Sequence, residues 1–141
     1  MLTIDRTAQV SVPAPPERCL ERLGDIEGYP SWASLIKRTE LTGGHVRMEA
    51  EMLGAGLVMD CSLELGSDRA VLRRVPYSLD DDELYEARWT VTPQGAASLV
   101  DLHVAAAIDV PGPARLVRGR IERRLVDNLL DDFARSFQPS T

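Results

Sequence analysis

The sequence has few of the residues on which metal, redox and disulfide chemistry depend. Its 141 residues include only two cysteines, Cys19 and Cys61, and two histidines, His45 and His103. No metal-type spacing links the two cysteines, and the histidines fall at a turn and at an outward-facing strand position. We therefore expect reduced thiols, no metal site and no cofactor.

Basic residues are fewer than acidic residues, and the sequence has no long hydrophobic run. Lysine and arginine total 16 against 22 aspartates and glutamates, which gives a formal net charge of -6. Phosphate binding needs a basic field, so this charge argues against nucleic acid as a partner. No apolar run approaches the roughly 20 residues of a membrane span, and no secretion signal opens the chain. These absences predict a cytoplasmic protein without a transmembrane segment.

What the sequence does contain is typical of one folded domain. Hydrophobic residues make up 44% and charged residues 27%, which are ordinary globular values. A chain of this length buries a sizeable core, and it shows no internal repeat, low-complexity tract or linker. We expect a single domain over residues 1–141. The sequence leaves open whether it is a monomer or a homodimer.

The hydrophobic pattern predicts an α+β layout. A strand over residues 2–12 precedes a helix that Pro15 and Pro16 open, and a short second helix is expected around residues 28–35. A closing helix over residues 114–137 follows Pro111-Gly112-Pro113. Between the helices, glycine-containing turns separate predicted strands at 36–41, 45–53, 57–65, 69–75, 83–92 and 97–110.

Two segments near the N-terminus carry a family resemblance. The first strand leads into Ala14-Pro15-Pro16-Glu17, and residues 25–32 read Asp-Ile-Glu-Gly-Tyr-Pro-Ser-Trp. Together they resemble the opening of the START-like (SRPBCC) superfamily, and most closely its bacterial polyketide cyclase/dehydrase and lipid-transport branch. The resemblance extends over nearly the whole chain. It implies a helix-grip fold, in which a curved antiparallel sheet of about seven strands wraps around a long C-terminal helix, with two short helices after the first strand.

A strongly curved sheet that packs on one helix leaves a space between them, and apolar cavities of this kind bind ligands. Strand alternation and helical spacing predict which side chains point into the space. Methionines there suit an adaptable lining, although methionine equally fills gaps in cores. The short helix with Trp32 is expected to cover the opening. The predicted ligand-binding residues are Trp32, Met48, Met52, Met59, Cys61, Arg74, Tyr77, Tyr85, Trp89, Arg118, Glu122, Leu125 and Leu129.

Charged residues provide the candidates for catalysis. Extending one buried stripe of the closing helix toward its start gives Glu122 and Arg118, which either face the cavity or are solvated where the helix overhangs the sheet. Alternation alone leaves two inward sets open for residues 69–75. These are Ala70, Leu72 and Arg74, or Val71, Arg73 and Val75. The resemblance favours an inward Arg74, because aromatase/cyclases carry an arginine at the matching point. The catalytic candidates are Arg74, Tyr77 and Glu122.

Other positions depart from the cyclase pattern. Cyclases of this class place polar groups, including a second arginine, on the inward face of the strand that matches residues 57–65. Here that face carries Leu57, Met59, Cys61 and Leu63, and Ile36 replaces a frequent tyrosine. The acids at 80–83 are predicted to form a solvated loop. The favoured function is therefore binding or transport of a hydrophobic small molecule, such as a lipid, an isoprenoid or a polyketide-like compound. The alternative is an aromatic polyketide cyclase/dehydrase.

Overall fold

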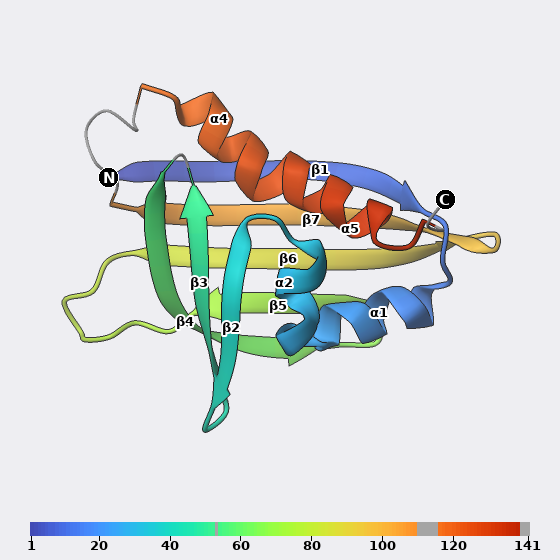
Figure 1. Ribbon diagram of the computed structural model, residues 1–141, viewed down its shortest axis with the longest axis horizontal. Coiled ribbons are helices and arrows are strands. Elements are labelled where there is room, and N and C mark those ends of the chain that lie inside the picture. Colours follow the sequence, from blue (N-terminus) through green and yellow to red (C-terminus); the bar gives the residue numbers. More distant parts are fainter. Residues whose placement is uncertain (53, 110–115, 139–141) are drawn as a thin grey trace.

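The computed structural model describes residues 1–52, 54–109 and 116–138 (Figure 1). Its elements are β1 (Leu2–Val12), α1 (Pro16–Gly24), η1 (Ile26–Gly28), α2 (Tyr29–Trp32), β2 (Ile36–Thr42), β3 (His45–Met52), β4 (Ala55–Leu65), β5 (Arg69–Arg74), β6 (Leu84–Gln94), β7 (Ala97–Ile108), α4 (Arg118–Glu122), η2 (Arg123–Asp127) and α5 (Asn128–Arg135). Here η1 is a 3₁₀ helix and η2 a π-helical segment.

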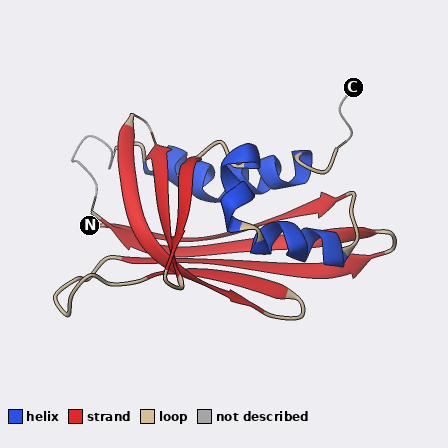
Figure 2. Cartoon of the chain, turned by 60° about the horizontal axis from the view of Figure 1, so that its bottom comes forward, coloured by secondary structure: helices blue, strands red, loops and turns tan. Residues whose placement is uncertain are grey.

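The strands form one antiparallel sheet in the order β1-β7-β6-β5-β4-β3-β2. In Figure 1, β2 and β3 run steeply across the direction of β1, β7 and β6, so the sheet turns strongly between its two ends. The helices all lie on the side toward which it bends (Figure 2). This arrangement confirms the predicted α+β helix-grip fold.

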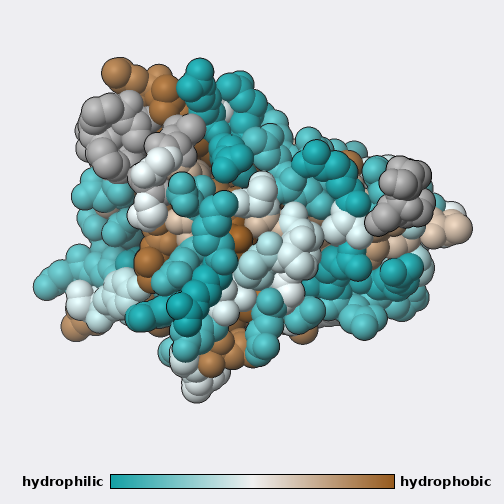
Figure 3. Space-filling view, viewed as in Figure 1, coloured by the Kyte–Doolittle hydropathy of each residue, from teal (hydrophilic) through white to brown (hydrophobic). Residues whose placement is uncertain are grey.

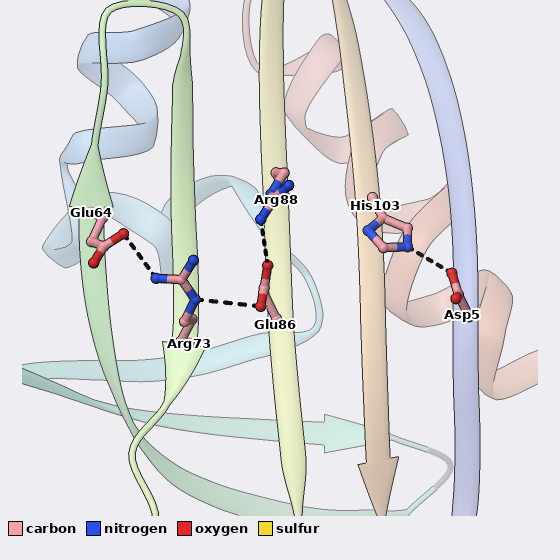
Figure 4. Close-up of polar contacts among 6 residues, drawn as sticks. All are labelled: Asp5, Glu64, Arg73, Glu86, Arg88 and His103. Carbon is pink, nitrogen blue, oxygen red and sulfur yellow. Dashed lines mark hydrogen bonds and ion pairs between the residues drawn. The ribbon is translucent and has the colours of Figure 1, made fainter.

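Alternation along the strands gives the sheet one apolar and one polar face. On β7 every second residue from Ser98 to Ile108 is buried, and β1 contributes Leu2, Ile4 and Val12 to the same core. Ion pairs cross the outer face of β4, β5 and β6, and a hydrogen bond links β1 to β7 (Figure 4). These are Glu64–Arg73 (2.8 Å), Arg73–Glu86 (3.4 Å), Glu86–Arg88 (3.0 Å) and Asp5–His103 (2.6 Å). The core is therefore confined to the face that the helices cover.

Two hairpins are tighter than the sequence predicts. Strand β4 begins at Ala55, opposite Met52, although a turn is expected over residues 54–56. Strand β6 continues through Pro93, which lies beyond the part of β6 that pairs with β5 and so leaves no ladder bond unmade on that side. Gly54 and Gly95 have φ values of 82° and 64°, which allow these short turns. Leu53, the expected end of β3, lies outside the described residues, as does Val110, the expected end of β7.

The predicted closing helix is present but irregular. It is described from Arg118 onward, and the expected start at Ala114 lies outside the described residues, as does Pro111-Gly112-Pro113. Residues Arg123–Asp127 form a π-helical segment, which inserts a wider turn between α4 and α5. The buried face of the helix carries Ile121, Leu125, Val126, Leu129, Leu130 and Phe133.

Helices α1 and α2 close the other end of the core. Pro16 occupies the first turn of α1, where its missing N–H leaves no bond unmade, and α1 buries Cys19 and Leu23. The Tyr29 hydroxyl donates to the Leu23 carbonyl at 2.5 Å, which ties α2 to the end of α1. The buried Ser98 hydroxyl donates to the Ala14 carbonyl at 2.7 Å and ties the start of α1 to β7.

Candidate ligand-binding site

An apolar cavity lies between the inner face of the sheet and the C-terminal helix. The volume of the cavity is about 40 Å³. The lining residues are Tyr29, Leu35, Ile36, Met48, Ala50, Met52, Leu57, Met59, Leu72, Tyr85, Ala87, Trp89, Ile108, Leu125 and Leu129. The predicted site residues among them are Met48, Met52, Met59, Tyr85, Trp89, Leu125 and Leu129. The outer surface over this region is mainly hydrophilic, with apolar residues only in small patches (Figure 3).

The methionines form one side of the cavity. Met48 on β3 lies directly opposite Met59 on β4, and Met52 follows on the same face of β3. Unbranched thioether side chains repack at low cost, so this side of the cavity adapts more readily than a wall of branched residues.

The sequence prediction missed the contribution of the segment between α2 and β2. Tyr29, Leu35 and Ile36 all line the cavity, because α2 turns Tyr29 rather than Trp32 toward it. Alternation does not indicate these positions, since Tyr29 begins a four-residue helix, Leu35 lies between α2 and β2, and Ile36 is the first residue of a strand.

Trp32 lies in an aromatic cluster behind the cavity wall, not in its lining. Its ring centroid is 6.1 Å from that of Trp89 and 5.2 Å from that of Phe133. Its indole Nε1 is buried and has no hydrogen-bond partner in the part of the chain that the structure describes. The structure thus places Trp32 as a packing residue between α2, β6 and α5, whereas the sequence predicts a cover over the opening.

Among the described residues, the polar side-chain groups of the cavity wall are the hydroxyls of Tyr29 and Tyr85 and the indole N–H of Trp89. The Tyr29 hydroxyl is occupied by the Leu23 carbonyl. The Tyr85 hydroxyl has no hydrogen-bond partner among residues 1–52, 54–109 and 116–138. Burial raises the pKa of both phenols well above the ordinary value, so both remain neutral and retain their protons near neutral pH.

A more polar vestibule adjoins the cavity. It shares Leu57, Met59 and Ile108 with the cavity lining and has a volume of about 340 Å³. Its polar wall is formed by Arg74, Tyr77, Ser78, Asp81, Glu83 and Asp109. The vestibule therefore lies beside the apolar space, at the end of the sheet where the β5–β6 loop lies.

Arg74 belongs to the inward set of β5, opposite Cys61, but its guanidinium is held by the β5–β6 loop through three hydrogen bonds. It donates to both carboxylate oxygens of Asp81, at 2.9 and 2.7 Å, and to the Glu83 carbonyl at 2.9 Å. The Arg74 and Asp81 side chains are only 7% and 10% exposed. The predicted solvated acidic loop is therefore wrong for Asp81.

Asp81 receives further hydrogen bonds that fix the loop. The backbone N–H groups of Tyr77 and Glu83 donate to its carboxylate at 2.9 and 3.2 Å. The Arg74 hydrogen bond, reinforced by these N–H groups, holds the pKa of Asp81 well below its ordinary value. Tyr77 is mostly exposed, with its ring 5.1 Å from the Arg74 guanidinium. These residues order the vestibule wall.

Arg118 and Glu122 lie over β1, away from the cavity. Arg118 contacts Glu122 at 3.1 Å and donates to the Thr3 carbonyl, and Glu122 lies 3.6 Å from Arg6. Arg6, on the inner face of β1, also forms a two-bond pair with Asp127 at 2.9 and 2.7 Å. Since Arg6 and the Thr3 carbonyl supply partners at the strand, the charges stay at the margin of the sheet. Of the two alternatives from the sequence, an inward Arg118–Glu122 pair is contradicted.

The remaining predicted residue, Cys61, is buried between β3 and β5 and is not part of the cavity lining. Burial raises the pKa of its thiol to about 12, so it is an inert thiol near neutral pH. Within the described ranges, no three of the histidine, cysteine, aspartate and glutamate side chains are grouped to hold a metal ion. Of the helices that the structure describes, none has the length and apolar character to cross a membrane.

The sequence profile of the family described as polyketide cyclase / dehydrase and lipid transport matches residues 3–138. The chain belongs to this family. Its members include cyclases and lipid carriers by description, so membership indicates a START-like ligand-binding or polyketide cyclase fold without choosing between them. Among curated proteins, no sequence match is found.

Solved structures show the same fold. A START superfamily protein from Mycobacterium smegmatis superimposes with a TM-score of 0.78 at 18% identity, covering 94% of this chain and 96% of the other. A protein from Thermus thermophilus gives 0.75 at 22% identity, with 94% and 95% covered. The Zhui aromatase/cyclase from a Streptomyces species gives 0.71 at 17% identity, with 97% of each chain covered. At these identities the likeness establishes the fold.

Proposed function

We propose that this protein binds or carries a hydrophobic small molecule in the cavity between sheet and C-terminal helix. The observation that carries the proposal is the lining itself, in which methionines, aliphatic residues and Trp89 surround a space that no charged side chain of the described residues enters. A lipid, an isoprenoid or a polyketide-like aromatic compound fits such a surface.

The cavity in this state is smaller than the few hundred Å³ of a typical ligand site. Two features support expansion on binding. The methionine side repacks readily, and the vestibule of about 340 Å³ adjoins the cavity across Leu57, Met59 and Ile108, which line both spaces. A ligand thus places its apolar part against Met48 and Leu129 and reaches toward the vestibule with the rest.

The alternative, an aromatic polyketide cyclase/dehydrase, is supported by the family description and by an Arg74 that borders the vestibule. Ring closure of a polyketone needs acid/base groups and donors at the developing enolate. Both Nη atoms of Arg74 already donate to Asp81 or to the Glu83 carbonyl, and Glu122 lies at the margin of the sheet near Arg6. The binding function therefore requires fewer changes to the observed contacts than cyclase activity does.

The proposal predicts saturable binding of the neutral fluorophore N-phenyl-1-naphthylamine with a dissociation constant in the micromolar range or below, about -8 kcal/mol or stronger. Probe emission should rise on transfer from water to the apolar cavity, and Trp89 emission should change with the same dependence on concentration. A linear, unsaturable signal up to the solubility limit of the probe would contradict the binding function.

A further inference from the structure

The hydroxyl of Tyr85 is a polar group in the cavity wall that has no hydrogen-bond partner in the described part of the chain. Tyr85 belongs to the inward set of β6, with the buried Ala87 and Trp89 at the next two inward positions. The Tyr85 side chain is half-buried, and its hydroxyl is not among the fully buried atoms without a partner, so it is open to a ligand or a water. A hydroxyl that lines a cavity and has no protein partner is available to donate to a ligand or to a water.

Two other polar side chains near the cavity are already paired, and a third is shielded. Tyr29 donates to the Leu23 carbonyl, and Arg74 uses its donors on Asp81 and on the Glu83 carbonyl. The indole Nε1 of Trp32 is buried behind the wall and does not reach the cavity surface. Among the described residues, a ligand inside the cavity therefore meets the Tyr85 phenol as the one hydroxyl without a partner, and the Trp89 indole N–H is a further polar group of the lining.

The charges around the cavity disfavour an anionic ligand. The lining has no cation among its described residues, and a carboxylate there would lose its hydration without an ion partner. The vestibule contains Arg74, whose charge is matched by Asp81, together with Glu83 and Asp109. A carboxylate passing through the vestibule faces an excess of negative charge.

From this geometry we infer that the ligand is an uncharged apolar molecule with one oxygen acceptor, a ketone, ester or alcohol, which accepts a hydrogen bond from Tyr85. This inference rests on the proposed binding function and narrows its ligand class. It excludes free fatty acids as preferred ligands. Because burial keeps the Tyr85 phenol protonated, affinity for such a ligand should be constant from about pH 6 to about pH 9.

The test compares three probes of nearly the same outline. They are 2-acetylnaphthalene, which has a ketone, 2-isopropenylnaphthalene, which has an alkene in its place, and 2-naphthoate. Tyr85→Phe should weaken binding of the ketone about three- to tenfold, the effect of one neutral hydrogen bond, and should leave the alkene unchanged or tighter. In the wild type, 2-naphthoate should bind at least about tenfold more weakly than the ketone.

Each of the other outcomes would show which part of the argument is wrong. Equal effects of Tyr85→Phe on ketone and alkene would show that Tyr85 only shapes the cavity, and tight binding of 2-naphthoate would overturn the uncharged class. If neither neutral probe binds the wild type, the binding function itself fails. If Tyr85→Phe does not fold, a measurement on the wild type alone still tests the hydrogen bond. The infrared carbonyl stretch of bound 2-acetylnaphthalene should lie below its frequency in hexane, and an unshifted band would refute the hydrogen bond.

Discussion

Replacing Phe133 by alanine is expected to lower the free energy of unfolding by about 3–5 kcal/mol, the usual cost of removing a buried aromatic side chain. Phe133 on α5 is 0% exposed, and its ring centroid lies 5.2 Å from those of Trp32, Trp89 and Phe137. This one side chain joins α2, β6 and the C-terminal end of the helix. Its loss opens a cavity that three rings cannot close without moving.

Urea denaturation followed by circular dichroism measures the change. Leu79→Ala is the matched control, because Leu79 is fully exposed in the β5–β6 loop and its truncation should change stability by less than about 0.5 kcal/mol. A loss below about 1 kcal/mol for Phe133→Ala would mean that α5 does not depend on the aromatic cluster for its position.

Replacing Met59 by tryptophan is expected to weaken binding of N-phenyl-1-naphthylamine by more than about tenfold. Met59 lines both the cavity and the vestibule, so a larger ring there fills the junction between them. Overpacking costs about 1–3 kcal/mol of stability, which leaves a folded protein if the wild type has ordinary stability.

Ser62→Trp is the control for the same strand. Ser62 alternates to the outer face of β4, opposite Arg73, and is not part of the cavity lining. Its replacement should leave probe affinity within about twofold of the wild type, since it adds the same ring on the other side of the sheet. Undiminished binding by Met59→Trp would show that the probe occupies another site.

The fold was predictable from local patterns, but several site contacts were not. Alternation places Met48, Met52 and Met59 inward because each strand has only two faces, and the paired register leaves no other choice. The position of Asp81 depends on its hydrogen bonds with Arg74, which lies seven residues earlier in the chain at the other end of the loop segment. An acidic run gives no indication of which carboxylate will be captured in this way.

The C-terminal helix shows a second limit. Helical spacing extends the stripe of Val126 and Leu130 to Glu122 and Arg118, but the π-helical segment widens the turn between α4 and α5. The partners of these charges, Arg6 and the Thr3 carbonyl, lie more than 110 residues away on β1. Helical periodicity contains no information about the wider turn or the distant partner. It therefore cannot show whether a charge at a helix end faces a cavity.

The most direct test of the binding site uses the methionine methyl groups. The chain has four methionines, of which Met48, Met52 and Met59 line the cavity, while Met1 is 48% exposed and is not part of the lining. With ¹³C-methyl-methionine label, titration with N-phenyl-1-naphthylamine should shift the three cavity signals along one saturation curve and leave the Met1 signal in place. Saturable binding that leaves the signals of Met48, Met52 and Met59 unmoved would contradict a ligand site between the sheet and the C-terminal helix.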